Sequence, residues 1–366
     1  MPGLGEVATL FLKLGAIGFG GPAAHIAMME DEVVARRGWI TRDRFLDLLG
    51  ATNLIPGPNS TELAIHIGHA RAGWRGLVVA GVSFIAPAVV IVTAIAWAYV
   101  RFGALPAVGA VLHGVKPVVI AIVVQAVWRL ARAAVTTRWM LLLAIASTAA
   151  VAAGMNELLL LLLAGGGAWL VRSVRGSGAA PLLIAPFGLI PLFAVFAKIG
   201  AVLFGSGYVL LAFLRTDLVE RLGWITERQL LDAVAVGQVT PGPVFTTATF
   251  IGYVVGGPAG AAAATVGIFL PAFVFVALSG PLIPRIRSSP RAGAALDAVN
   301  VASLALMAVV SWQLGTSTLV DTPTILIGIV SFLLLRFRIN SAWLILAGAT
   351  VGLLLLREAA GVTVMQ

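Results

Sequence analysis

Long runs of apolar residues separated by short polar segments dominate this chain. The most uniform runs are residues 78–99, 140–153, 158–171, 261–278 and 342–356. A helix needs about 17–25 apolar residues to cross the hydrocarbon core of a bilayer, and the shorter runs are marginal by that measure. The pattern therefore predicts an all-α polytopic membrane protein.

Composition also indicates a lipid environment. Hydrophobic residues make up 60% of the chain and charged residues 11%, with a mean hydropathy of +1.04. This leaves too little polar surface to cover a soluble domain of 366 residues. The net charge of +9 includes no basic run of the kind that binds nucleic acid. Its arginines lie singly or in pairs at the ends of apolar segments, where membrane topology explains them.

The residue types required by metal and redox sites are scarce. The chain has no cysteine and four histidines, and only His66 and His69 are spaced as a ligand pair. We therefore expect no metal and no cofactor. A nucleophile–base pair and a nucleotide-binding loop are also missing from the sequence, which argues against an enzyme. The first apolar segment contains Lys13 and lacks a following cleavage site, so we expect a retained N-terminus and a multi-pass membrane protein.

One motif occurs twice, 185 residues apart. The first copy contains FLKLGAIGFGG from Phe11, GWIT from Gly38 and PGPNST from Pro56, and the second contains FAKIGAVLFGS from Phe196, GWIT from Gly223 and TPGPVFT from Thr240. Between residues 11–61 and 196–246, 19 of 51 positions are identical, and the match resumes further on at an offset of 184. The chain is therefore a duplication, and we predict two domains, residues 1–178 and 179–366.

Each Pro-Gly-Pro must interrupt a helix, because proline removes a backbone donor and glycine adds conformational freedom. In each half we expect a first helix (residues 11–29 and 190–214), a GWIT turn whose threonine (Thr41 or Thr226) caps the next helix, the broken segment, and four further helices. The broken segment is either re-entrant, which leaves five transmembrane helices per half, or a full crossing, which makes six.

The arginines discriminate between these topologies. With re-entrant segments and inverted halves, 16 of the 21 arginines fall on one face, whereas full crossings and parallel halves divide them 13 to 8. The sharper asymmetry favours two inverted-topology repeats, each of about five transmembrane helices plus a broken or re-entrant Pro-Gly-Pro hairpin. The arginine-rich face is then cytoplasmic, and both termini lie on the opposite face.

The two breaks predict a shared cavity, because irregular backbone inside a membrane is tolerated only where it is buried in protein or lines a cavity. After each break the chain restarts as a helix, whose unpaired N–H groups attract anions. The candidate substrate-binding residues are Gly57, Asn59, Ser60 and Thr61 in the first half and Gly242, Thr246 and Thr247 in the second, with Asn53 and Gln238 as secondary candidates.

Lys13 and Lys198 occupy matching positions in apolar surroundings. A lysine inside the membrane costs about 2.5–3.5 kcal/mol on insertion scales, so a matched pair indicates that both face a cavity and bind an anion. The alternative is that they snorkel to the headgroups. Lys116 is a secondary candidate, because its counterpart is Asn300. The glycines near the lysines predict close helix packing.

Two residues are candidates for proton coupling. Glu62 directly follows the first Asn-Ser-Thr run, and its counterpart is Thr247. A carboxylate in a low-dielectric site can carry a proton, although an ion pair with Lys13 or Arg71 explains Glu62 equally well. His25, near the end of the first helix, is the other candidate, with helix capping as the alternative.

These motifs resemble the chromate ion transporter family, in its long-chain two-domain type. The resemblance rests on FLKLGAIGFGGPAAHIAMMEDEVV, GWIT and LIPGPNSTELAIHIGHARAGWRG in the first half, and on FAKIGAVLFGSGY and TPGP in the second. It implies a location in the bacterial inner (plasma) membrane, export of chromate from bacterial cells, chromate resistance, and two domains of opposite topology. One departure is Glu62, which replaces the glutamine common in that motif and puts chromate itself in question.

The sequence thus predicts a secondary transporter that moves chromate outward by alternating access at the repeat interface. The alternative is an uptake transporter or channel for sulfate or a related oxyanion. The expected partners are a lipid bilayer, the oxyanion, and a coupled proton or counter-anion; a homodimer stays open, and nucleic acid is excluded.

Overall fold

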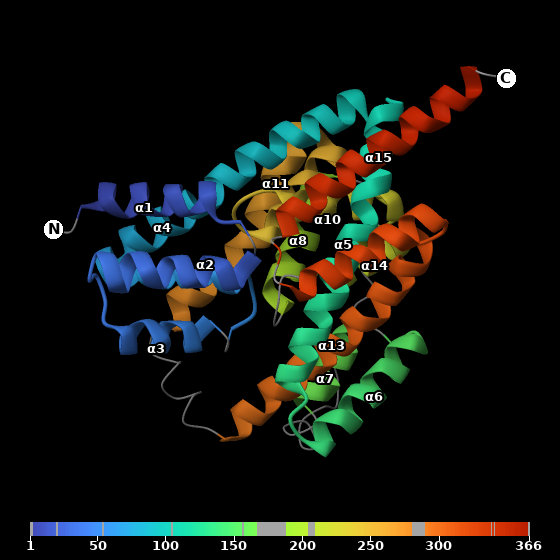
Figure 1. The fold of residues 1–366 in the computed structure, drawn as a ribbon. Helices are drawn as coiled ribbons and strands as arrows, with labels where there is room; N and C mark the ends of the chain where they lie inside the picture. The colour runs from blue at the N-terminus through green and yellow to red at the C-terminus, as the bar shows by residue number, and fades with distance from the viewer. Residues whose placement is uncertain are drawn as a thin grey trace.

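The computed structural model describes residues 3–19, 21–52, 55–103, 105–155, 157–166, 188–203, 209–279, 290–337, 339 and 341–364. Within these ranges all regular structure is helical (Figure 1). This confirms the predicted all-α class. The predicted boundary between residues 178 and 179 lies outside the described residues, as does Asn53.

The two halves contribute helices in the same order. The first half contains α1 (Leu4–Ile17), α2 (Gly21–Glu30), η1 (Asp31–Arg36), α3 (Arg42–Thr52), α4 (Asn59–Phe102), α5 (Pro106–Ala134), α6 (Arg138–Ala152) and α7 (Glu157–Gly166). The second contains α8 (Leu189–Val202), α9 (Leu210–Leu214), η3 (Arg215–Arg221), α10 (Glu227–Val239), η4 (Val244–Thr246), α11 (Thr247–Ser279), α13 (Pro290–Thr318), α14 (Thr322–Arg336) and α15 (Ser341–Val364).

Four of these helices, α4, α5, α11 and α13, are long and apolar enough to cross a membrane. Shorter apolar helices of 10–17 residues accompany them in α6, α8, α14 and α15. Many of their large apolar side chains are exposed, as expected of surfaces that face lipid. The described helices are therefore consistent with a polytopic membrane protein.

Three groups of helices make up the molecule (Figure 1). The first consists of α1, α2 and α3, which pack on α4. In the centre, α4 packs on α11, and α11 packs on α8. The third group joins α5 to α13, α14 and α15, with α6 and α7 against α13. Helices from both halves of the sequence thus meet in the centre and in the third group.

The predicted first helix over residues 11–29 is wrong. The chain breaks after Ile17, Gly18 has φ −74° and ψ 86°, and α2 begins at Gly21, whose φ is +76°. Its counterpart over residues 190–214 is divided as well, into α8 and α9. The glycines expected to serve helix packing also release the backbone from the helix.

The duplication is visible in backbone geometry. α4 and α11 each consist of two helices, which meet at a non-helical pair of residues at matching positions. Ala72 and Gly73 have φ/ψ of −141°/23° and 61°/−149°, and Gly256 and Gly257 have −139°/20° and 61°/−154°. The same break therefore divides each segment into a short first part and a long second part. The two parts lie side by side, because a Cβ on Gly68 would overlap the Gly76 carbonyl and the Thr249 hydroxyl bonds to the Thr265 hydroxyl.

Gly15 and Gly200 set the spacing within each repeat. A Cβ atom on Gly15 would overlap the carbonyl oxygen of Phe84, and one on Gly200 would overlap that of Ile268. The pairs α1/α4 and α8/α11 therefore approach through their backbones, which confirms the predicted packing role of these glycines.

The matching helices α4 and α11 run antiparallel where they pack. Tyr99, near the end of α4, stacks on Phe250, near the start of α11, with ring centroids 5.1 Å apart. Gly81, earlier in α4, contacts Phe273, near the end of α11. Phe250 is next to Thr249, whose hydroxyl bonds to that of Thr265, so the second parts of α4 and α11 run in opposite directions where they pack.

The two GWIT turns lie at opposite ends of the second part of α4. Trp39, in the first turn, lies 5.0 Å below the guanidinium of Arg71, next to the kink. Arg228, just after the second turn, lines a cavity with Gly103, at the far end of the helix. The roughly 28 residues between these ends span about 40 Å, the thickness of a bilayer with its headgroups.

The N-terminus does not lie where the arginine count places it. The Glu6 carboxylate is 3.7 Å from the Arg71 guanidinium, so the start of α1 lies beside the kink of α4. The arginine count assigns the N-terminus and Arg71 to opposite faces, which is wrong because residues 11–29 do not form one continuous crossing helix. The threonine cap is confirmed at Thr226, which forms a capping box with Gln229.

We expect Gly15→Ala to destabilise the protein by about 1–3 kcal/mol, because the added methyl group must push α1 away from α4. Gly5→Ala is the matched control on the same helix, since its Cβ would meet no atom within 4 Å. Thermal unfolding in detergent measures both. Equal unfolding midpoints for the two variants would show that this backbone contact does not set the spacing.

Candidate functional site

Each Pro-Gly-Pro segment is hydrogen-bonded to the other repeat. The Gly57 N–H donates to the Leu203 carbonyl at 2.8 Å, and the Gly242 N–H donates to the Gly18 carbonyl at 2.9 Å. Gly57 matches Gly242 in the repeat, and Gly18 matches Leu203. The two bonds are therefore reciprocal, as contacts related by an approximate two-fold axis are. Each break after α1 or α8 is therefore hydrogen-bonded to the Pro-Gly-Pro break of the other repeat.

Both central glycines have backbone conformations that other residues rarely adopt. Gly57 has φ +140°, and Gly242 has φ +89°. A Cβ on Gly57 would also overlap the Glu62 carboxylate, and one on Gly242 would crowd Ala88 of α4. Glycine is therefore required at both positions by conformation and by space.

The first repeat buries polar atoms without satisfying them. Asn59 begins α4, and Ser60, Thr61 and Glu62 of its first turn are buried. Within the described part of the chain, the Thr61 hydroxyl and both Glu62 carboxylate oxygens lack a hydrogen-bond partner. Buried polar groups of this kind are costly, and they mark a place where a ligand, an ion or water completes the site.

The second repeat satisfies the matching atoms internally. The Thr246 hydroxyl donates to the Pro243 carbonyl, and the Thr247 hydroxyl donates to the Val244 carbonyl, both at 2.8 Å. Gln238 lies close by, since it lines a small cavity with Thr247. The two repeats thus differ in the hydrogen bonding of this centre.

The ion-pair explanation of Glu62 does not hold. The Lys13 ammonium pairs with Glu32 at 2.7 Å, and Arg71 pairs with Glu6. Glu62 is fully buried against Gly57 instead. Its position on the Pro-Gly-Pro segment that contacts the second repeat keeps the proton-coupling hypothesis open.

The matched lysines each form an ion pair within their own repeat. Lys13 of α1 pairs with Glu32 of η1, and Lys198 of α8 donates to Asp217 of η3 at 2.7 Å. Both carboxylates lie 19 residues after their lysine, on a π-helical turn. π-Helical turns are often found at functional sites. The lysines thus fasten the first helix of each repeat to the segment before its GWIT turn.

Glu32 and Asp217 are the principal residues that the sequence reasoning missed. Their signal was present, since an acidic residue recurs at the same spacing after the lysine in both copies. Arginines add to both pairs, with Arg37 at 3.2 Å from Glu32 and Arg221 at 3.4 Å from Asp217. The Lys13 hydrogen bond, with that of Arg37, lowers the pKa of the Glu32 carboxyl, so Glu32 stays ionised.

His25 contributes to the contact between the repeats. Its Nε2 lies 2.8 Å from the Gly18 carbonyl, the same oxygen that accepts the Gly242 N–H. The ring is buried edge-on against Phe84, at 5.4 Å between centroids. The capping alternative therefore describes this geometry, and His25 holds the break after α1 in place.

Lys116 lies away from the Pro-Gly-Pro segments, in a separate ion pair. Its ammonium is 3.0 Å from Asp232 of α10, which is fully buried. The Tyr99 hydroxyl donates to the other Asp232 oxygen at 2.8 Å. Two residues of the first repeat thus compensate a buried charge of the second.

A membrane protein with broken helices that meet between two repeats, and with buried polar groups at the breaks, has the features of a transport protein. The chromate transporter family model matches residues 5–170 and 190–353. The chain therefore belongs to the chromate transporter family. Its curated relatives are named as transport proteins.

Curated relatives match over almost their full length. The chain is 32% identical to the probable chromate transport protein of Synechococcus elongatus, over 90% of this chain and 89% of that protein. It is 34% identical to the chromate transport protein of Cupriavidus metallidurans, over 95% and 92%, and 34% identical to that of Pseudomonas aeruginosa, over 89% and 85%. No solved structure matches the chain.

We expect Lys198→Met to destabilise the protein by about 3 kcal/mol, because the Asp217 charge is left buried with less compensation. The double variant Lys198→Met/Asp217→Leu should regain most of this loss. Lys13→Met should cost less, because the Lys13 side chain is 49% exposed. Thermal unfolding of the three variants measures the pattern. An unfolding midpoint of Lys198→Met equal to that of the wild type would contradict a stabilising ion pair.

Proposed function

We propose that this protein is a secondary transporter that exports chromate across the bacterial inner membrane and so confers chromate resistance. The observation that carries the proposal is the reciprocal contact of the two Pro-Gly-Pro segments, next to buried polar groups that lack partners within the described chain. Membership of the chromate transporter family and the names of the relatives supply the substrate. Chromate is a tetrahedral dianion, for which helix N-termini and hydroxyl groups are suitable ligands.

In this proposal the substrate binds at the start of α4. The residues that bind it are Gly57, Asn59, Ser60 and Thr61, with Gly242, Thr246 and Thr247 shaping the opposite wall. Lys13 and Lys198 remain candidates, because an oxyanion could replace one of the contacts that each ammonium makes with its carboxylate. The buried Thr61 hydroxyl, which has no partner in the described chain, supports placing most of the polar contacts with the substrate in the first repeat.

Alternating access follows if the repeats are inverted. Two observations support inversion: α4 and α11 run antiparallel, and the two GWIT turns lie at opposite ends of α4. The hydrogen bonds of Gly57 and Gly242 then join two bodies of opposite orientation at the middle of the membrane. Movement of one body against the other would expose the site to each side in turn.

Glu62 is the proposed proton carrier. Its carboxylate is fully buried without a hydrogen-bond partner in the described chain, and an ionised group there is strongly disfavoured. A proton taken up by Glu62 would therefore favour the closed contact around Gly57. Loss of the proton would favour an arrangement in which water reaches the carboxylate, which couples the proton to the conformation.

Cells that produce the protein should accumulate several-fold less chromate than cells with an empty vector, and a protonophore should abolish the difference. Glu62→Gln should remove most of the effect, because glutamine cannot exchange a proton. Glu6→Gln, at an exposed glutamate of α1, is the control.

Increased accumulation would instead support the alternative, oxyanion uptake. An unchanged protonophore-sensitive effect in Glu62→Gln would reject Glu62 as the carrier. Flux of radiolabelled sulfate and of chromate into proteoliposomes with an imposed pH gradient separates the substrates and distinguishes a transporter from a channel.

Inversion predicts that the two GWIT turns lie on opposite faces of the membrane. Because the protein has no native cysteine, Arg36→Cys and its matched position Arg221→Cys report this cleanly. A membrane-impermeant thiol reagent added to intact cells should label one variant, and the other should react only after the cells are opened. Labelling of both from the same side would refute inversion.

A further inference from the structure

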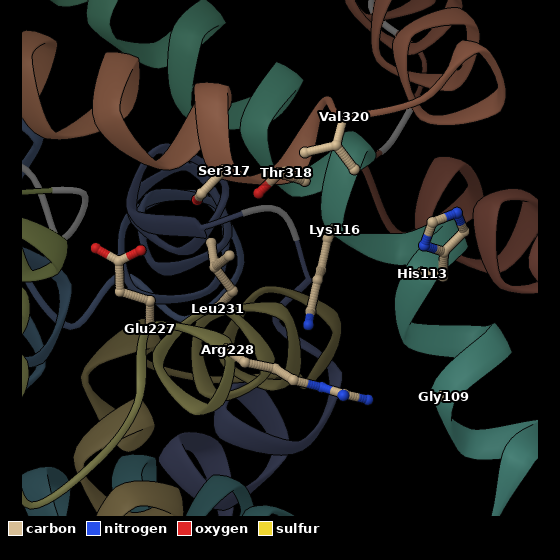
Figure 2. A pocket seen from close by; sticks show the side chains of 9 residues that line it. All are labelled: Gly109, His113, Lys116, Glu227, Arg228, Leu231, Ser317, Thr318 and Val320. Atoms are coloured by element: carbon tan, nitrogen blue, oxygen red, sulfur yellow. The ribbon is translucent and has the colours of Figure 1, made fainter.

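A cavity of about 420 Å³ lies between α5, α10 and the end of α13, away from the Pro-Gly-Pro segments. Its walls are formed by Gly109, His113, Lys116, Glu227, Arg228, Leu231, Ser317, Thr318 and Val320, and we call it the Lys116 cavity (Figure 2). Arg228 and Gly109 also line a neighbouring cavity of about 530 Å³ that reaches Tyr99. The two cavities together exceed the size of any tetrahedral oxyanion.

Two cations extend into the Lys116 cavity from different helices. Lys116 reaches in from α5 and Arg228 from the first turn of α10, and their charged ends are directed to the same space (Figure 2). His113 lies one turn before Lys116 on the same helix. A planar guanidinium group and an ammonium group that line the same cavity are well suited to binding an oxyanion, since both donate charge-assisted hydrogen bonds.

The end of α13 adds to the lining a polar atom that lacks a partner within the described chain. Thr318 ends α13 and is only 7% exposed, and its hydroxyl has no hydrogen-bond partner among the described residues. Ser317, beside it, already donates to the Leu314 carbonyl. A buried hydroxyl that lines the same cavity as two cations lacks the acceptor that a bound oxyanion would supply.

The carboxylates around the Lys116 cavity are already paired. Glu227 accepts a hydrogen bond from Arg215 at 2.6 Å. Asp232 pairs with Lys116 at 3.0 Å and accepts a hydrogen bond from the Tyr99 hydroxyl. Asp321 caps α14 through the Thr324 N–H, and it contacts His113 at 3.2 Å. An ammonium has three protons, so Lys116 can hold Asp232 and still donate into the cavity.

The repeat shows that this group of cations belongs to one half only. The residues that match His113, Lys116 and Arg228 in the other half are Asp297, Asn300 and Asp43. Three cationic or titratable positions are therefore replaced by two acids and an amide. A structural requirement of the fold would have kept the residue types similar in both copies, so a function confined to one face explains the difference better.

We propose that the Lys116 cavity is a second binding site for a tetrahedral oxyanion, present on only one face of the protein. The inference rests on the proposed oxyanion transport and deepens it. α10 runs from this cavity to the second Pro-Gly-Pro segment, so its 13 residues place the two sites about 20 Å apart. The Lys116 cavity thus concentrates the oxyanion at one mouth of the pathway before or after it occupies the central site.

Single cysteines test the site without background, because the chain has none. Ser317→Cys places a thiol at the cavity wall, and Thr316→Cys, an exposed neighbour outside the lining, is the matched control. Sulfate is the probe, since chromate would oxidise the thiol. In purified full-length protein, sulfate should slow labelling of Ser317→Cys several-fold more than chloride at equal ionic strength does, and it should leave Thr316→Cys unaffected.

Two further variants assign the effect to the cations. Adding Arg228→Gln to Ser317→Cys should raise the sulfate concentration needed for protection by about tenfold. It should also lower the preference of the thiol for an anionic over a cationic reagent by about threefold, the effect of one unit charge several ångströms away in water. Lys116→Gln should act in the same direction, and the exposed Arg228 provides the test if Lys116→Gln fails to fold.

Sulfate protection that is equal at Ser317→Cys and Thr316→Cys, or unchanged by Arg228→Gln, would overturn the second site. This outcome is separate from the transport assays. If sulfate does not protect the Ser317→Cys thiol and chromate export is intact, the second site in the Lys116 cavity is rejected and the proposed function is not. Protection without transport of any oxyanion keeps the cavity as an anion site and rejects the proposed function.

Discussion

The arrangement of the protein depends on the need to satisfy backbone groups at broken helices inside an apolar medium. Four breaks occur near the centre, after α1, after α8 and at the two Pro-Gly-Pro segments. The hydrogen bonds from Gly57 to Leu203 and from Gly242 to Gly18 join them in pairs, each across the two repeats. Each Pro-Gly-Pro glycine thus finds its acceptor in the other repeat. The halves therefore complete each other at the point where a substrate would bind.

The duplication preserves the scaffold and varies the chemistry. The kinks at Gly73 and Gly257 have nearly the same dihedral angles, and the ion pairs of Lys13 and Lys198 are repeated with their spacing. At the starts of α4 and α11 the copies differ, since Thr61 and Glu62 lack partners in the described chain whereas the hydroxyls of Thr246 and Thr247 bond to their own turn. Symmetry thus supports the fold, and asymmetry locates the polar chemistry.

The lysine ion pairs likewise divide into those that both repeats share and one that is present only once among the described residues. The ion pairs of the lysines with Glu32 and Asp217 lie within each repeat and fasten its first helix to the segment before its GWIT turn. The Lys116–Asp232 pair joins α5 to α10 across the repeats and is not duplicated, because the matching positions hold Asn300 and Asp47. Paired charges in a low-dielectric interior hold helices in a defined register, and removal of one partner leaves the other with the full cost of burial.

The amino-acid sequence by itself determined the membrane class, the duplication, the required breaks at Pro-Gly-Pro and the cap at Thr226, because these follow from composition and from local backbone chemistry. It could not predict that residues 11–29 would divide at Gly18, since glycine serves equally for close packing and for a break. Only the tertiary structure decided that Lys13 and Lys198 face carboxylates, that Glu62 has no partner in the described chain, and that Arg228 and Lys116 share a cavity. These outcomes depend on contacts between side chains of helices that are distant in sequence. Residue spacing indicates such a contact only where both copies of the repeat share the spacing, as they do for each lysine and the carboxylate that follows it.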